Sequence, residues 1–292
     1  MVVKAVTVAT ADEGFFRALQ QSAQRHGVDL RVLGCGEKWG GFGWKLRKLA
    51  EFLEACDPDD LVLCIDAYDV VFLRPLDDLE TWYRRHVADG GAPVVSSIED
   101  RGGIGDVTAG VLFGRCRGTL LNAGTYMGTP PALLALLQDM CRAGACDSRD
   151  ADDQRLLTSA CVRRPDLVDI DRGQRLFALW GFPTLRRPGY LRVVDGQLWF
   201  RGARPFLLHC PGNLDMSPVL RELGYDGDWH ATKRGPGYYV GVAIAQLRYL
   251  AREQPLTFAA LAALVALLGA ALAWAAAFAA CVLARKISAV AA

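Results

Sequence analysis

The chain lacks the features that mark several large classes of protein. Its 33 basic and 32 acidic residues leave a formal net charge of +1, which excludes the broad basic surface that nucleic-acid binding needs. Its nine cysteines contain no CxxC pair and no zinc-ribbon spacing, which argues against a structural metal. Internal repeats and low-complexity linkers are also missing. The length of 292 residues suits one large α/β domain or two small ones.

The scattered cysteines predict buried free thiols, because several lie in apolar runs, as Cys64 does. Free thiols would favour a reducing compartment. Cys141 and Cys146 are close enough for a local disulfide, and the sequence leaves that pairing open. The N-terminal residues are β-branched and run into a polar turn at residues 12–14, so we expect a first buried strand and no secretion signal.

The hydrophobic pattern predicts an α/β fold. Strands are expected at residues 2–9, 28–34, 61–65, 92–97 and 109–113, and helices at 13–26, 45–56, 131–142 and 152–161. Residues 165–240 are rich in strands and loops. The alternation at the start of the chain is typical of a largely parallel sheet with helices on both faces.

The C-terminal part differs in kind. Residues 256–283 contain no charge over 28 positions. A helix of this length extends about 42 Å, more than the roughly 30 Å of a hydrocarbon core. We therefore predict a domain at 1–240, a connector at 241–255 and a transmembrane helix at 256–283. A long buried core helix is the alternative.

Two carboxylates mark the strongest local motif. The apolar strand at 61–65 is followed by Asp66 and, three residues later, by Asp69. Ligands of open α/β sheets bind beyond the carboxyl ends of strands, and paired carboxylates there suit Mg²⁺ or Mn²⁺. A strand-end cap made by Asp66, with Asp69 exposed, is the alternative.

Two further groups could join these acids. Residues 150–154 form a second acidic cluster, which would serve equally well as the N-terminal cap of the helix that follows. His209 ends the apolar run from residue 205 and precedes a turn. A histidine in this position can be a neutral metal ligand, although a structural role is the commoner one for a lone histidine.

Together these motifs resemble one family, the glycosyltransferase domain of the multifunctional procollagen lysyl hydroxylases and, more distantly, the procollagen galactosyltransferases. The resemblance covers roughly residues 3–215, with the motifs in family order. They are Thr7-Val-Ala-Thr10, Glu13-Gly14-Phe15, Leu33-Gly34-Cys35-Gly36-Glu37-Lys38-Trp39, Lys45-Leu-Arg, Asp66-Ala-Tyr-Asp69-Val, Glu99, Leu121-Asn122-Ala-Gly124, Tyr126-Met-Gly128, Asp152-Asp153-Gln154 and Leu208-His209.

The resemblance implies a GT-A-like fold, a Mn²⁺ or Mg²⁺ ion and a UDP-sugar donor, UDP-glucose or UDP-galactose. It assigns the residues as follows: the metal to Asp66, Asp69 and His209; the donor to Thr10, Lys45, Asp66 and Asn213; the reaction site to Asp152, Asp153 and Asn122. The implied acceptor is hydroxylysine or galactosylhydroxylysine in a collagen-like chain. A solvated lysine at a helix start is the alternative for Lys45.

Several features depart from the family. Ala67 replaces a serine, the turn after His209 reads Cys-Pro-Gly-Asn213, and the loop after Glu99 is short and lacks a nearby tryptophan. No histidine is followed two residues later by aspartate, so the iron site of a hydroxylase is missing. A catalytically weak membrane scaffold, or a transferase acting on a glycan or lipid-linked acceptor, therefore stays open. We expect a C-terminal single-pass anchor with the N-terminal domain cytosolic, and a lumenal orientation remains possible.

Overall fold

The computed structural model describes residues 2–148, 151–181, 189–212, 214–228, 230 and 235–290. The chain divides into two units, Met1–Lys233 and Arg234–Ala292. The elements of the first unit are β1 (Val3–Val8), α1 (Phe16–Arg25), β2 (Leu30–Leu33), α2 (Phe42–Glu54), β3 (Leu61–Ile65), β4 (Val70–Phe72), α3 (Asp77–Ala88), β5 (Val94–Ile98), α4 (Ile104–Phe113), β6 (Leu121–Gly128), α5 (Pro130–Met140), a 3-10 helix (Arg142–Asp147), α6 (Asp153–Arg163), β7 (Val168–Ile170), β8 (Phe177–Leu179), β9 (Leu191–Val194), β10 (Gln197–Phe200), β11 (Leu207–His209) and α8 (Ser217–Glu222).

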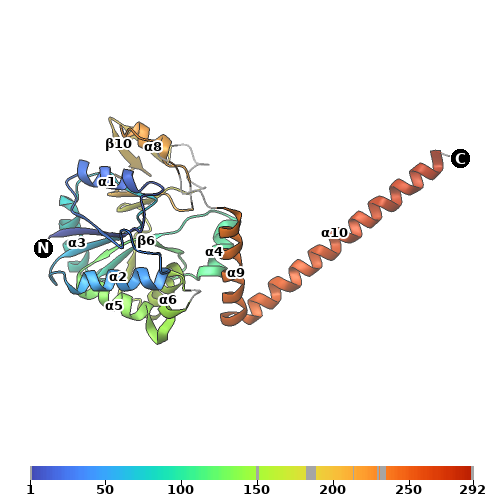
Figure 1. Cartoon of the computed structure of the whole chain (residues 1–292), viewed down its shortest axis with the longest axis horizontal. Coiled ribbons are helices and arrows are strands. Elements are labelled where there is room, and N and C mark those ends of the chain that lie inside the picture. Colours follow the sequence, from blue (N-terminus) through green and yellow to red (C-terminus); the bar gives the residue numbers. More distant parts are fainter. Residues whose placement is uncertain are drawn as a thin grey trace. The chain divides into compact units, whose positions relative to one another are not determined.

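The main sheet has six strands in the order β2-β1-β3-β6-β5-β7. In Figure 1, helices α2, α5 and α6 lie below the labelled strand β6 and helix α1 lies above it. Strand β1 is parallel to both β2 and β3, and β5 is parallel to β7, whereas β6 runs antiparallel to its two neighbours. The parallel β1 and β3 bring their carboxyl ends to one edge of the sheet. The predicted α/β fold with a parallel-rich sheet is confirmed, and its assignment to the GT-A class stays a prediction.

The two faces of the sheet pack against different helices because side chains alternate along a strand. On β3, Val62 and Cys64 join the core that contains leucines of α2, α5 and α6. Leu61, Leu63 and Ile65 point to the opposite core, which contains buried residues of α1 and α3. Because all five β3 residues are buried, the chain emerges from this strand at a fixed position.

A second, three-stranded sheet has the order β4-β11-β8. Strand β11 is antiparallel to β4, with His209 opposite Val70, and parallel to β8. Strand β4 follows β3 after a four-residue loop, residues 66–69. This loop therefore joins the two sheets. The separate hairpin of β9 and β10 packs its buried side, which includes Leu198 and Phe200, onto a third core cluster.

One predicted strand is wrong. Residues 109–113 belong to helix α4, which lies between Gly103 and Gly114, both with positive φ. A short apolar run does not distinguish a strand from a helix by its periodicity, and the glycines at both ends allow the chain to enter and leave a helix here. Helix α2 also begins earlier than expected, at Phe42, directly after Gly41 at φ 88°.

The expectation of free thiols is wrong for Cys116 and Cys161, and the Cys141–Cys146 pairing that the sequence left open is formed. Cys116 is bonded to Cys161, and Cys141 to Cys146. The other cysteines of the first unit, Cys35, Cys56, Cys64 and Cys210, are free. Sequence spacing gave no sign of the first pair because its partners are 45 residues apart and meet only when α6 packs beside the loop before β6. The argument for a reducing compartment therefore loses its basis.

The second unit consists of α9 (Pro236–Glu253) and α10 (Pro255–Val290). The window Pro255–Leu272 of α10 has a mean hydropathy of 2.2 and none of it is buried. By length and composition it is long and apolar enough to cross a membrane. The predicted boundaries at residues 240, 255 and 283 and the orientation of the anchor remain predictions.

Candidate functional site

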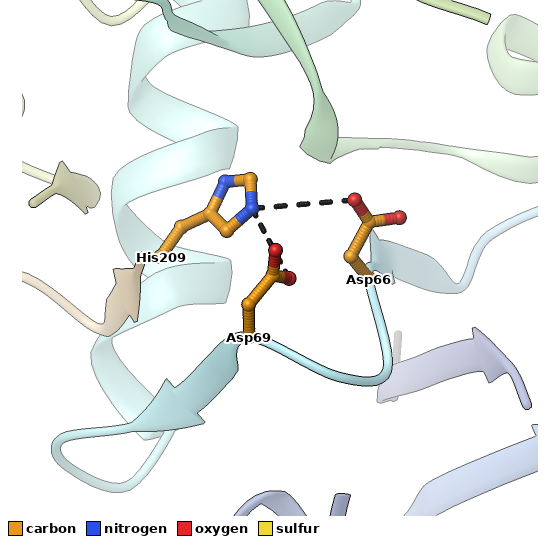
Figure 2. A group of neighbouring side chains, drawn as sticks. All are labelled: Asp66, Asp69 and His209. Atoms are coloured by element: carbon orange, nitrogen blue, oxygen red, sulfur yellow. Dashed lines mark ion pairs between the residues drawn. The ribbon is translucent and has the colours of Figure 1, made fainter. Parts of the chain in front are cut away.

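Three side chains from two sheets converge at the carboxyl edge of the main sheet. Asp66 follows β3, Asp69 precedes β4, and His209 ends β11 (Figure 2). The His209 Nε2 atom lies 3.3 Å from Asp69 Oδ1 and 4.0 Å from Asp66 Oδ2. One potential ligand atom from each residue lies within 4.8 Å of the others. A hydrogen bond from the Cys210 amide to the Asp69 carbonyl, at 2.8 Å, holds the ends of β11 and the loop together.

The histidine is unusual because it is buried without a good hydrogen bond. His209 is only 2% exposed, and neither ring nitrogen has a hydrogen-bond partner in the described part of the chain. Burial opposes protonation, but the charge of Asp69, its side-chain contact with the imidazole and then the charge of Asp66 raise the pKa of His209. A buried polar group without a partner is costly. The Nε2 atom contacts the Asp69 carboxylate without hydrogen-bond geometry, and a cation between the three side chains would therefore give it a partner.

Gly124 of β6 makes room for the cluster. A Cβ atom at this position would lie 2.2 Å from His209 Cε1 and 2.8 Å from Asp66 Oδ2. The Gly124 carbonyl also accepts the Asp66 amide at 2.8 Å. Any side chain here would collide with both groups, so a residue without Cβ is required where the three side chains of the cluster meet.

The backbone at Gly124 is fixed by a buried polar chain. Strand β6 bulges against β5, since Ser97 pairs with Asn122 while the adjacent Ser96 pairs with Tyr126. Within the bulge, Asn122 Oδ1 accepts the Gly124 amide at 2.7 Å, and Asn122 Nδ2 donates to Glu99 Oε2 at 2.8 Å. Asn122 thus holds the backbone beside the cluster and Glu99 orients it, while its predicted place near the donor sugar stays a prediction.

Lys45 reaches the same cluster from α2. Its ammonium group lies 2.6 Å from Asp66 Oδ1 and 2.8 Å from Asp153 Oδ2. The Lys45 side chain is 8% exposed, so the alternative of a solvated lysine is wrong. Burial lowers its pKa, but the charges of Asp153 and Asp66 together raise it well above the ordinary value. Burial raises the pKa of Asp153 to about 6, against the opposing charge of Lys45.

The remaining predicted residues divide into three cases. Asp152 caps α6, its Oδ1 accepting the Arg155 amide at 3.0 Å, as the alternative interpretation of the acidic cluster expected. Thr10 follows β1 at the same sheet edge, and its amide donates to the Tyr68 hydroxyl at 3.0 Å. Asn213 lies outside the described residues. Which of these side chains contact a donor stays a prediction.

Tyr68 is a residue that the sequence reasoning missed. It lies inside the loop between Asp66 and Asp69, and its hydroxyl accepts the amides of both Thr10 and Ala11, at 3.0 and 3.3 Å. The loop is thereby tied to the end of β1. Its position between the two acids was a visible signal, because a large aromatic residue in so short a loop must pack on a neighbouring element.

The cluster fits a divalent cation. A cation about 2.1 Å from each of its ligands places neighbouring ligands about 3 Å apart and opposite ligands about 4 Å apart. The separations of His209 from Asp69 and Asp66, 3.3 and 4.0 Å, lie in this range. Two carboxylates with one imidazole offer oxygen and nitrogen donors without a thiolate, a set that a divalent cation such as Mn²⁺ can accept.

Comparison with known proteins agrees with this geometry. Residues 1–102 match the family model of the PLOD GT domain. The resemblance to this glycosyltransferase domain is confirmed. The matched part of the PLOD-like domain contains Lys45, Asp66 and Asp69, whereas Asp153 and His209 lie beyond it.

Similar curated proteins carry corresponding names. The chain is 27% identical over 191 residues to the multifunctional procollagen lysine hydroxylase and glycosyltransferase of Caenorhabditis elegans, covering 59% of this chain and 25% of that protein. It is 28% identical over 151 residues to procollagen-lysine,2-oxoglutarate 5-dioxygenase of Drosophila melanogaster, covering 47% and 20%. A 77-residue match to the mouse procollagen-lysine,2-oxoglutarate 5-dioxygenase 1 is 42% identical, covering 23% and 11%. The chain thus spans a quarter or less of these relatives.

Proposed function

We propose that the first unit is a metal-dependent glycosyltransferase that moves glucose or galactose from a UDP-sugar to a hydroxyl acceptor. The observation that carries the proposal is the convergence of Asp66, Asp69 and His209 beside Lys45 in a PLOD-like domain. Hydroxylysine or galactosylhydroxylysine of a collagen-like chain is the acceptor class that the relatives' names suggest.

The protein's own residues would divide the work at the donor diphosphate. A bound Mn²⁺ or Mg²⁺ would supply positive charge that stabilises the leaving UDP. Asp66, Asp69 and His209 would hold it, and Lys45 would place a second cation beside the same phosphates. Lys45 Nζ contacts Asp66, which would also bind the metal. The ammonium group would therefore lie close to the diphosphate of a bound donor.

The acidic side of the site would serve the sugar and the acceptor. Asp153 keeps Lys45 in position through the 2.8 Å contact, and Asp152, the N-cap of α6, is its neighbour in the chain. Asn122 acts by holding the Gly124 backbone, which keeps the space for the ligands open. The C–O bond to UDP would break with oxocarbenium character on the sugar, as in other glycosyl transfers.

A donor screen tests the proposal. The full chain is incubated with Mn²⁺ and UDP-glucose, UDP-galactose or other nucleotide sugars, with and without a collagen-like peptide that contains hydroxylysine, and UDP release is measured. Acceptor-stimulated release supports the proposal. Donor binding without turnover on any acceptor would favour the scaffold, and release only with a glycan or lipid-linked acceptor would replace the collagen assignment.

Asp66→Asn and Asp69→Asn provide the matched test of metal dependence. Each removes one charged ligand without changing side-chain size, so we expect UDP release to fall at least about 100-fold with the fold retained. Mn²⁺ binding measured by calorimetry should weaken in parallel. Asp78→Asn, at an exposed position on α3, is the control. Near-normal turnover in both ligand variants would disprove the metal assignment.

We also propose that α10 anchors the chain in a membrane. The motivation is the apolar, unburied window Pro255–Leu272. Carbonate extraction of membranes carrying the full chain should leave it in the pellet. Protease treatment of sealed vesicles then reports which side the first unit faces. Release by carbonate would refute the anchor.

A further inference from the structure

The hairpin of β9 and β10 carries an exposed face with an uncommon composition. Two turn residues, Asp195 and Gly196, both with positive φ, connect its strands. Trp199 lies opposite Arg192, and Val194 lies opposite Gln197. All four side chains of this β9–β10 face are exposed, whereas Leu198 and Phe200 on the other side are buried.

Three arginines lie on or next to this hairpin. The Arg204 guanidinium lies 6.0 Å from the Trp199 ring centre, and Arg201 extends over Tyr190 at 5.1 Å. Arg192, Arg201 and Arg204 are exposed, and none of them forms an ion pair with another residue that the structure describes. The hairpin's own acid is Asp195 in the turn. The face therefore presents unneutralised positive charge around an indole and a valine that are 36% and 48% exposed.

This combination fits a membrane surface. Tryptophan is enriched at the boundary between headgroups and hydrocarbon, and arginine pairs with lipid phosphates. The same chain carries the apolar helix α10. Once that helix is inserted, the first unit is confined near the bilayer at a high effective concentration, so a weak surface contact becomes sufficient.

We infer that the β9–β10 face docks on the anionic phospholipid surface of the membrane that α10 enters; the inference rests on the proposed anchor. The docked face would hold the first unit at a fixed distance from the bilayer. Three arginines beside anionic lipid favour the docked state by on the order of 100-fold over a neutral surface, an effect that salt would screen.

Hydroxyl-radical footprinting of the full chain in nanodiscs tests the docking. The chain is placed in discs of phosphatidylcholine alone, or of phosphatidylcholine with phosphatidylserine, and side-chain oxidation is read by mass spectrometry. Trp199 should oxidise at least about threefold more slowly in the anionic discs than in the neutral ones. Trp39, which is 45% exposed on the β2–α2 loop, is the internal reference and should not change.

Matched charge variants give the control. Arg192→Gln, Arg201→Gln and Arg204→Gln together should restore the fast oxidation of Trp199 in anionic discs. A second triple variant removes the same charge from other exposed positions, Arg17, Arg31 and Arg85. It should leave the protection intact.

Three results would overturn the inference. Equal Trp199 oxidation in both kinds of disc refutes docking. Protection that appears only when a collagen-like peptide is added would make this face an acceptor site instead. Trp274 on α10 separates the two proposals: if it oxidises as fast as Trp39 in the discs, the anchor itself fails, and if it is protected while Trp199 is not, only the docking fails.

Discussion

Replacing Gly124 with alanine is the most informative single perturbation of the site. The new Cβ would lie 2.2 Å from His209 Cε1, whereas carbon atoms in contact are normally about 3.5–4.0 Å apart. His209 is buried and cannot turn into solvent, so the ring or β6 must move by more than about 1 Å. Overpacking of this size costs ~1–3 kcal/mol of the free energy of unfolding.

The effect on metal binding should be larger than the effect on stability. Ligand distances at a metal site tolerate deviations of about 0.2 Å, so a shift of about 1 Å removes His209 from the ligand set. The new methyl also crowds Asp66 Oδ2, at 2.8 Å. We expect Mn²⁺ affinity to fall at least about 100-fold, above the 10–100-fold typical of changes around a metal site.

Calorimetric titration of the full chain in detergent with Mn²⁺ measures the affinity, and chemical unfolding measures the stability. Gly173→Ala is the control, because a Cβ there meets Arg175 Cγ at an ordinary 3.4 Å. If Gly124→Ala stays folded and binds Mn²⁺ within about twofold of the wild type, then Asp66, Asp69 and His209 do not hold the metal as a set. The argument that Gly124 keeps space for these side chains would then be wrong.

Three further predictions concern the rest of the first unit. Lys45→Met should lower the free energy of unfolding by ~3–5 kcal/mol in chemical unfolding, because it leaves the Asp66 and Asp153 carboxylates without their cation. Adding Asp153→Asn should cost less than the sum of the single changes, because it removes one of these two charges. Replacing both Cys116 and Cys161 with serine should cost ~4 kcal/mol, the entropy of closing a loop of that length, and non-reducing mass spectrometry should find this bond in the wild type. Burial raises the pKa of Asp60, but hydrogen bonds from Lys4 and Val2 lower it overall; the stability advantage of the wild type over Asp60→Asn should therefore be full above about pH 5 and shrink as the pH falls below about 4. A difference that grows at low pH would contradict this pairing.

Local patterns predicted the sheet edge well. Strand β3 has the predicted bounds, and Asp66 and Asp69 follow it because a strand buried on both faces leaves little freedom to the loop after it. The local pattern marked His209 as a candidate ligand, but only the motif resemblance placed it with Asp66 and Asp69. Lys45 was predicted to touch the donor diphosphate, a role that remains open, but its contacts with Asp66 and Asp153 depend on how α2 and α6 pack.

Features that depend on contacts between distant parts of the chain could not be predicted from local sequence patterns. Strand β4 is three residues long and has no periodicity of its own; it exists because β11 pairs with it. Helix α4 was mistaken for a strand because its apolar residues do not favour one face. The Cys116–Cys161 bond joins elements far apart in the chain, and the space at Gly124 exists only once β11 has brought His209 against β6.

The loop that joins the two sheets has a consequence for how the molecule forms during synthesis. Asp69 leaves the ribosome 140 residues before His209, with Gly124 between them. Strand β11 can pair with β4 only after this segment has closed, and such non-local pairing is slow, so the site should be among the last parts of the first unit to assemble. Until then Asp66 and Lys45 can pair without a metal. Metal uptake during refolding would therefore follow the appearance of most secondary structure, and a chain stopped before residue 209 would hold both aspartates and still lack the site.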